Sequence, residues 1–251
     1  MSRPLPPVRA AAVLASHELR LTARRGENIL VTMIIPVAVL LFFASTGIVP
    51  GVAGRPVDFL LPGALTLAVI ASGLVNLGIA TAYERSYGVL KRLGGAPLPS
   101  WALVAAKIAA VLVLEIVQIV LLVGVAALVL GWRPGAGASP TLLVAGLLLG
   151  TLAFAGLGLL LAGTLRAEAT LALANGLFLA FLMLGGVVLP VDHLPGPLEA
   201  LAKVLPAAAL SDVLRAALGS AGGEGAGGAL AILAGWGLVS SGLAARFFRW
   251  E

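Results

Sequence analysis

Long apolar runs separated by short polar segments form the hydropathy pattern of this chain of 251 residues. A helix needs about 20 mostly apolar residues to cross the hydrocarbon core of a bilayer. Six runs are long enough, so the pattern predicts an all-α membrane protein with six transmembrane helices. The six runs are residues 29–46, 57–82, 101–130, 141–164, 170–189 and 228–245.

The composition supports this interpretation. Hydrophobic residues make up 60% of the chain and charged residues only 11%, with a mean hydropathy of +1.10, whereas soluble domains carry about 25% charged residues. The apolar runs leave no room for a separate soluble domain. We therefore expect residues 1–251 to form a single transmembrane domain.

The net charge of +5 does not indicate nucleic-acid binding, because the basic residues cluster beside apolar runs instead of forming a stripe with interleaved aromatic residues. The absence of cysteine excludes disulfides and zinc–thiolate sites. His17 and His193 lie in different polar segments. We expect no metal site and no catalytic residue on this chain.

The basic residues predict the orientation, because Lys and Arg concentrate in cytoplasmic loops. Twelve of the 16 lie on one side of the six spans, so both termini are expected in the cytoplasm of a prokaryote, with a multi-pass chain in its cytoplasmic membrane. The twelve are Arg3, Arg9, Arg20, Arg24, Arg25, Arg85, Lys91, Arg92, Lys107, Arg166, Arg246 and Arg249; Arg55, Arg133, Lys203 and Arg215 lie on the other side.

Residues 1–28 alternate apolar and basic positions at helical spacing and lack the features of a cleaved signal peptide. This pattern predicts an amphipathic helix along the inner leaflet before the first span. A disordered basic tail is the alternative interpretation.

The polar segment after the second run, YERSYGVLKRLGG, begins at Tyr83. As one helix it would place Tyr83, Tyr87 and Leu90 on one face, with basic residues on a flank. Such an aromatic ridge fits the groove of a partner protein. Alternatively, its basic residues only set the topology and bind anionic lipid. Glycines and the prolines at 97 and 99 end the helix, and Lys107 is expected to extend toward the membrane interface.

The segment from Tyr83 to Lys107 resembles the signature of ABC-2 type permeases, the membrane subunits of ATP-binding-cassette exporters. The matching residues are Glu84, Gly88, Leu90, Arg92, Leu93, Pro97 and Lys107, while Val89 stands where threonine is commoner. The resemblance implies a cytoplasmic coupling helix that docks into the ATPase subunit. The residues it would assign to ATPase coupling are Tyr83, Glu84, Arg85, Tyr87, Gly88, Leu90, Lys91 and Arg92.

A second stretch, residues 185–219, is similar to the family's extracellular segment before the last span. The matching residues are Leu194, Pro195, Pro206, Asp212 and Arg215. Its apolar pieces are too short to span and are separated by prolines, which favours two short re-entrant helices within residues 190–227. A capping subdomain on the membrane surface is the alternative. The resemblance implies an extracytoplasmic gate that includes Pro195, Pro206, Asp212 and Arg215.

Four polar residues lie inside the predicted spans. Glu115 shares a helix face with Gln118, and a charge at that depth costs at least about 2.5 kcal/mol. Glu115, Gln118, Asn76 and Asn175 are candidates for a translocation path. The alternative interpretation is hydrogen bonding between packed helices.

No G-x-x-x-x-G-K-[ST] phosphate loop is present in the sequence. The resemblance therefore implies a non-catalytic subunit of an exporter for a lipophilic substrate such as a drug, lipid or glycolipid. ATP and Mg²⁺ would bind two copies of a separate ATPase, and a second permease subunit, identical or different, would complete the complex within membrane lipid. An ion- or proton-coupled secondary transporter centred on Glu115 is the alternative function.

Overall fold

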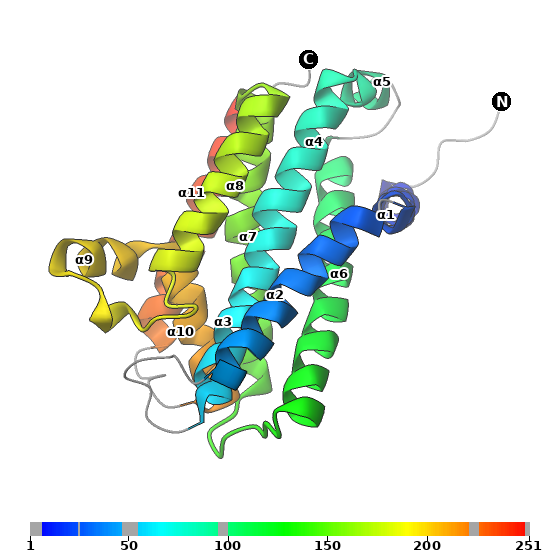
Figure 1. Cartoon of the computed structure of the whole chain (residues 1–251). Coiled ribbons are helices and arrows are strands. Elements are labelled where there is room, and N and C mark those ends of the chain that lie inside the picture. Colours follow the sequence, from blue (N-terminus) through cyan, green and yellow to red (C-terminus); the bar gives the residue numbers. More distant parts are fainter. Residues whose placement is uncertain (1–6, 25, 47–54, 95–99, 221–225, 249–251) are drawn as a thin grey trace.

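The computed structural model describes residues 7–24, 26–46, 55–94, 100–220 and 226–248, and these ranges contain helices and no strand (Figure 1). Five helical stretches within them are long and apolar enough to cross a membrane. The prediction of an all-α, multi-pass membrane protein is confirmed. The five stretches are Pro56–Ser86, Leu103–Val129, Pro140–Thr164, Ala167–Leu184 and Ala226–Phe247.

The first predicted span corresponds to helix α2 (Gly26–Thr46). Its apolar part with described side chains is Thr32–Thr46, which is shorter than the five others. The first of the six predicted spans therefore stays a prediction. Arg3, Arg25 and Arg249, which contributed to the predicted orientation, lie outside the described residues.

The bundle has two distinct ends (Figure 1). Helix α1 (Pro7–Arg24) is seen nearly along its own axis and so lies across the upright helices. Toward the same end lie α5 (Val89–Gly94) and the last turn of α11 (Ala226–Phe247). We call this the α1 end. The opposite end, with α9 (Gly196–Val204) and α10 (Pro206–Leu218), is the α10 end.

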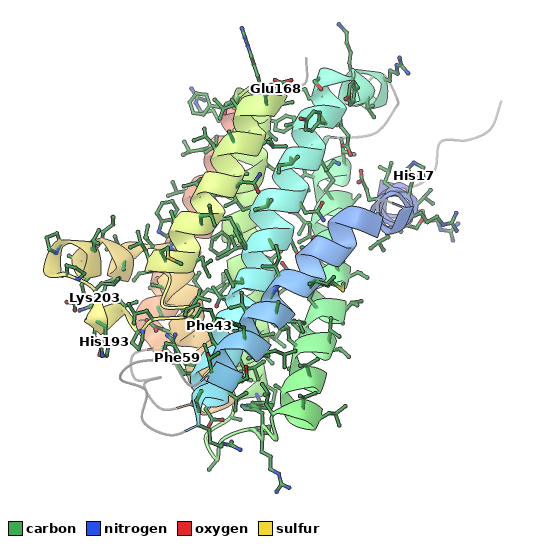
Figure 2. All side chains as sticks on the ribbon, in the orientation of Figure 1. His17, Phe43, Phe59, Glu168, His193 and Lys203 are labelled. Atoms are coloured by element: carbon green, nitrogen blue, oxygen red, sulfur yellow. The ribbon has the colours of Figure 1, made fainter. Side chains whose placement is uncertain are left out.

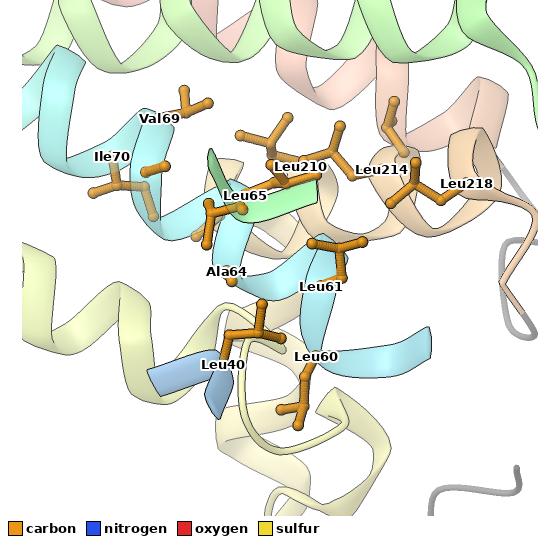
Figure 3. Close-up of a cluster of buried hydrophobic side chains, with 14 of the residues drawn as sticks. Leu40, Leu60, Leu61, Ala64, Leu65, Val69, Ile70, Leu210, Leu214 and Leu218 are labelled. Carbon is orange, nitrogen blue, oxygen red and sulfur yellow. The ribbon is translucent and has the colours of Figure 1, made fainter. Parts of the chain in front are cut away.

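The second span forms the centre of the bundle. It runs without a break through α3 (Pro56–Ile70), a π-helical turn η1 (Ala71–Asn76) and α4 (Leu77–Ser86). Most of it is buried, as expected for a helix that is apolar on all sides. Leucines of α3 pack against leucines of α10 to form the core (Figure 3); the labelled leucines of the two helices are Leu60, Leu61, Leu65, Leu210, Leu214 and Leu218.

The π-helical turn packs closely against α7 (Pro140–Thr164). A Cβ atom added to Gly158 would lie 2.5 Å from the carbonyl oxygen of Gly73. Only a residue without a side chain allows this approach of two backbones. The glycines of the second and fourth spans therefore fix the distance between the two helices.

The fifth span ends earlier than predicted. Helix α8 (Ala167–Leu184) stops at Leu184 instead of residue 189, because Gly185 and the left-handed Gly186, at φ +65°, terminate it. The chain continues through a 3₁₀ turn, Val191–His193, into α9 and α10. The predicted re-entrant segment thus contains two short helices; their insertion into a membrane stays a prediction. The third span is α6 (Ser100–Val129).

Candidate functional site

The segment predicted to dock a partner is divided by a turn. Helix α4 ends at Ser86, and Gly88 adopts a left-handed conformation, φ +67°, before α5 begins. Tyr87 is 72% exposed and stacks on Tyr83 with ring centroids 6.1 Å apart. Leu90 is fully buried. The expectation that Leu90 shares the tyrosine face is wrong, because the turn at Gly88 breaks the continuous helical spacing on which it depended.

The basic residues of this segment have different environments. Arg85 donates a hydrogen bond to the carbonyl of Leu165, the residue that ends α7, and so satisfies a carbonyl left free by the helix end. Lys91 and Arg92 are exposed on α5. The exposed surface near the turn, which we call the tyrosine turn, consists of Tyr87, Val89, Lys91 and Arg92. Gly95, Pro97 and Pro99 lie outside the described residues.

Lys107 connects three helices at the α1 end. Its Nζ lies 2.6 Å from Glu84 Oε2 on α4 and 3.0 Å from Glu18 Oε1 on α1. The lysine itself is on α6 and only 3% exposed. Two carboxylates therefore hold the ammonium group inside the protein, and its predicted position at the membrane interface stays a prediction. We call Glu18, Glu84 and Lys107 the ion triad.

A cavity of about 530 Å³ opens beside the central span, between α2, the η1–α4 stretch and α8. Asn76 and Asn175 both line it, as do Tyr83 and Tyr87. The amide of Asn76 has no hydrogen-bond partner among the described residues, whereas Asn175 Nδ2 donates to the Leu171 carbonyl at 2.9 Å. The cavity thus joins two of the candidate path residues to the tyrosine turn.

Glu115 and Gln118 lie instead between packed helices, and both are at most 2% exposed. Ser72 Oγ lies 2.8 Å from Gln118 Oε1, and Thr151 donates to Glu115 Oε2 at 2.6 Å. Gln118 Nε2 reaches the carbonyl of Thr32 at 3.3 Å. This geometry favours the interpretation that the two residues hold helices together, and it leaves their part in a path a prediction.

The predicted gate residues lie at the α10 end. Pro195 precedes α9, and Pro206 is the first residue of α10. Arg215 donates to Asp212 at 2.9 Å and to the carbonyl of Gly186, and its guanidinium lies 4.3 Å from the Phe59 ring centroid. Burial raises the pKa of Asp212 and lowers that of Arg215, while the pairing opposes both shifts.

Sequence patterns did not identify three features of these sites. Glu18 is the lone described acidic residue in an otherwise basic α1, and that contrast is the signal that could have found it. Phe59 and Trp132 flank the ends of the second and third spans beside Arg55 and Arg133. Aromatic and basic residues at span ends are typical of membrane interfaces, but only the fold brings these four together.

The long apolar helices define a multi-pass integral membrane protein. A family model for the ABC-2 type transporters matches residues 9–218, from α1 through α10. The chain belongs to this family, as its signature-like segments indicated. No individual curated protein matches the chain. A member of this family is typically a non-catalytic membrane component that associates with an ABC ATPase.

Proposed function

We propose that this chain is the permease subunit of an ATP-driven exporter in the cytoplasmic membrane of a prokaryote. The observation that carries the proposal is the tyrosine turn, an exposed aromatic and basic surface at the end of the buried central span. An exposed tyrosine that a second ring supports is suited to a groove on a partner protein. On the membrane-embedded subunit of an ABC transporter, that partner is the ATPase.

The excess of Lys and Arg on the side of the predicted spans that includes the α1 end supports a cytoplasmic location for that end. In the proposed complex two ATPase copies bind ATP and Mg²⁺, and two permease subunits meet within the membrane. Because the ATPase would move the tyrosine turn and α4 together, motion passes directly into the central span. The ion triad joins the same helix to α1 and α6, so these helices move with it.

The cavity between α2, the η1–α4 stretch and α8 is the proposed entry for substrate. Apolar residues such as Ile35, Ile79 and Phe178 line it together with the two asparagine amides. A mostly apolar pocket of this size with a few polar groups fits a lipophilic molecule. Drugs, lipids and glycolipids are the expected substrate classes.

Reconstitution tests the function. The chain is co-expressed with an ABC ATPase from the same organism, and the complex is placed in vesicles containing a fluorescent lipophilic drug. We expect drug movement with ATP and Mg²⁺, and none with a proton gradient alone. Movement driven by the gradient without ATP would instead establish a secondary transporter and overturn the proposal.

Replacing Asn76 by leucine tests the cavity. Loss of one neutral hydrogen bond is worth about 0.5 to 1.5 kcal/mol, so we expect the drug concentration for half-maximal ATPase stimulation to change by about twofold to twelvefold. Basal ATPase activity should stay unchanged. Thr164→Val, at the exposed end of α7 outside the cavity, is the control. If both variants changed the drug concentration for half-maximal stimulation equally, the drug would bind outside the cavity beside Asn76.

A further inference from the structure

A second cavity, of about 700 Å³, lies at the α10 end where the second span begins and the third span ends. Hydrogen bonds between distant segments build its walls. Arg55 donates to the carbonyl of Gly131 at 3.0 Å, Ser220 donates to the carbonyl of Asp58 at 2.8 Å, and Gly135 N donates to the carbonyl of Leu218 at 3.0 Å. The cavity is therefore a feature of the folded chain and not a gap beside a single loop.

Arg215 forms one wall of this cavity and is 6% exposed. A buried guanidinium is costly unless its charge and donors are matched. Arg215 Nη1 donates a hydrogen bond to Asp212, and Nη2 donates one to the carbonyl of Gly186. The third donor, Nε, has no partner among the described residues. Asp212 is itself half exposed, so water weakens its compensation of the buried charge.

Arg133 adds a cation that no described carboxylate neutralises. Four basic residues line the cavity, and three of them have acidic partners: Arg55 with Asp58, Arg215 with Asp212 and Lys203 with Glu199. Arg133 is exposed and has no ion pair or hydrogen bond within the part of the chain that the structure describes. Asp192, a further carboxylate of the lining, acts on Arg215 and Lys203 over a longer distance, so the cation without a direct partner is Arg133, and the one whose donors are incompletely paired is Arg215.

The depth of the cavity identifies the kind of anion it meets. Pro56 begins the second span and Val129 ends the third, so the cavity lies at the level of the lipid headgroups. Phe59 and Trp132 also line it, and aromatic side chains are enriched at that level. Figure 2 shows Phe59, His193 and Lys203 together at this end, away from Glu168 at the other. Phosphodiesters are the anions that a bilayer presents there.

We propose that this cavity binds the phosphate of an anionic lipid headgroup, with Arg133 as the donor at its mouth and Arg215 as the buried charge. A guanidinium fork matches phosphate oxygens in pairs. The site lies at the opposite end of the bundle from the tyrosine turn. Its occupation does not depend on the proposed ATPase, and it is separate from the cavity beside Asn76.

Binding of short-chain lipids to the purified full chain tests the proposal. The probes are dihexanoylphosphatidylglycerol, the zwitterionic dihexanoylphosphatidylcholine and inorganic phosphate, with dissociation constants measured by native mass spectrometry. We expect the anionic lipid to bind most tightly and Arg133→Gln to weaken it about tenfold, because a charge-assisted hydrogen bond is lost. Arg133→Lys should retain part of the affinity.

Arg166→Gln is the matched control, since Arg166 is an exposed arginine at the other end of the bundle. Unchanged melting temperatures would show that both variants fold. Displacement of the lipid by millimolar inorganic phosphate would support the phosphate site and identify free phosphate as a ligand source. Equal binding of both lipids to the native chain, or equal losses in the two glutamine variants, would overturn the proposal.

Discussion

Replacing Lys107 by methionine is expected to detach α1 from the bundle and to abolish stimulation of the ATPase. The substitution keeps most of the apolar stem of the side chain but leaves Glu18 and Glu84, which are 18% and 12% exposed, beside each other without their shared cation. Removal of one partner of a buried ion pair costs about 3 to 5 kcal/mol. The melting temperature of the purified chain and the ATPase rate of the reconstituted complex measure the two effects.

Two further variants separate charge from fold. Lys203→Met removes an exposed lysine paired with Glu199 at the other end of the bundle, and its melting temperature should stay close to that of the native chain. The triple variant E18Q/K107M/E84Q leaves no unpaired charge, so stability should return. If Lys107→Met melted like Lys203→Met, the ion triad would not be what holds α1 in place.

Tyr87→Asp is expected to weaken association with the ATPase about 30-fold while the chain still inserts and folds. The tyrosine ring is largely exposed, so its loss removes little internal packing, yet an aromatic anchor in a partner's groove is worth about 2 kcal/mol or more. Titration of the purified ATPase against the permease in nanodiscs gives the affinity. Leu90 is left unchanged, because it is fully buried and its replacement would disturb the fold.

Two neighbouring substitutions complete this test. Tyr87→Phe retains the ring and its stacking on Tyr83, so docking should be nearly unchanged. Ser86→Asp adds the same negative charge one residue earlier, at an exposed position where the helix α4 ends. A loss with Ser86→Asp as large as that with Tyr87→Asp would indicate general repulsion, and no loss in either would remove the tyrosine turn from the ATPase interface.

The membrane spans could be predicted because crossing a bilayer imposes a length and a composition that are local in sequence. The face that docks the partner was harder to predict from the sequence. The spacing of Tyr83, Tyr87 and Leu90 fits one helix, but a single glycine with positive φ turns Leu90 into the protein. Gly88 was visible in the sequence, yet glycine is also tolerated inside membrane helices, so its presence alone did not reveal a turn.

The contacts of the polar residues could not be predicted, since they join segments far apart in the chain. Gln118 meets Ser72 across 46 residues, and Lys107 meets Glu18 across 89. Hydropathy indicates that such residues need partners, because an unpaired polar group in hydrocarbon is costly, but it does not say which ones. The choice depends on how the helices pack, and packing follows close contacts such as that between Gly73 and Gly158.

The π-helical turn also has a consequence for comparing chains of different length. In η1 the amide of Leu77 donates to the carbonyl of Ser72, five residues back, which is one residue more than an α-helical turn accommodates. A relative lacking one residue between Ala71 and Asn76 would wind through this stretch as an α-helix, and the residues on both sides would keep their orientation around the span, because the π-helical turn absorbs the extra residue. Its Tyr87 equivalent would then point in the same direction. A single-residue gap in this part of an alignment therefore leaves the geometry of docking unchanged, whereas the same gap in an α-helical part of the span would rotate everything after it by about 100°.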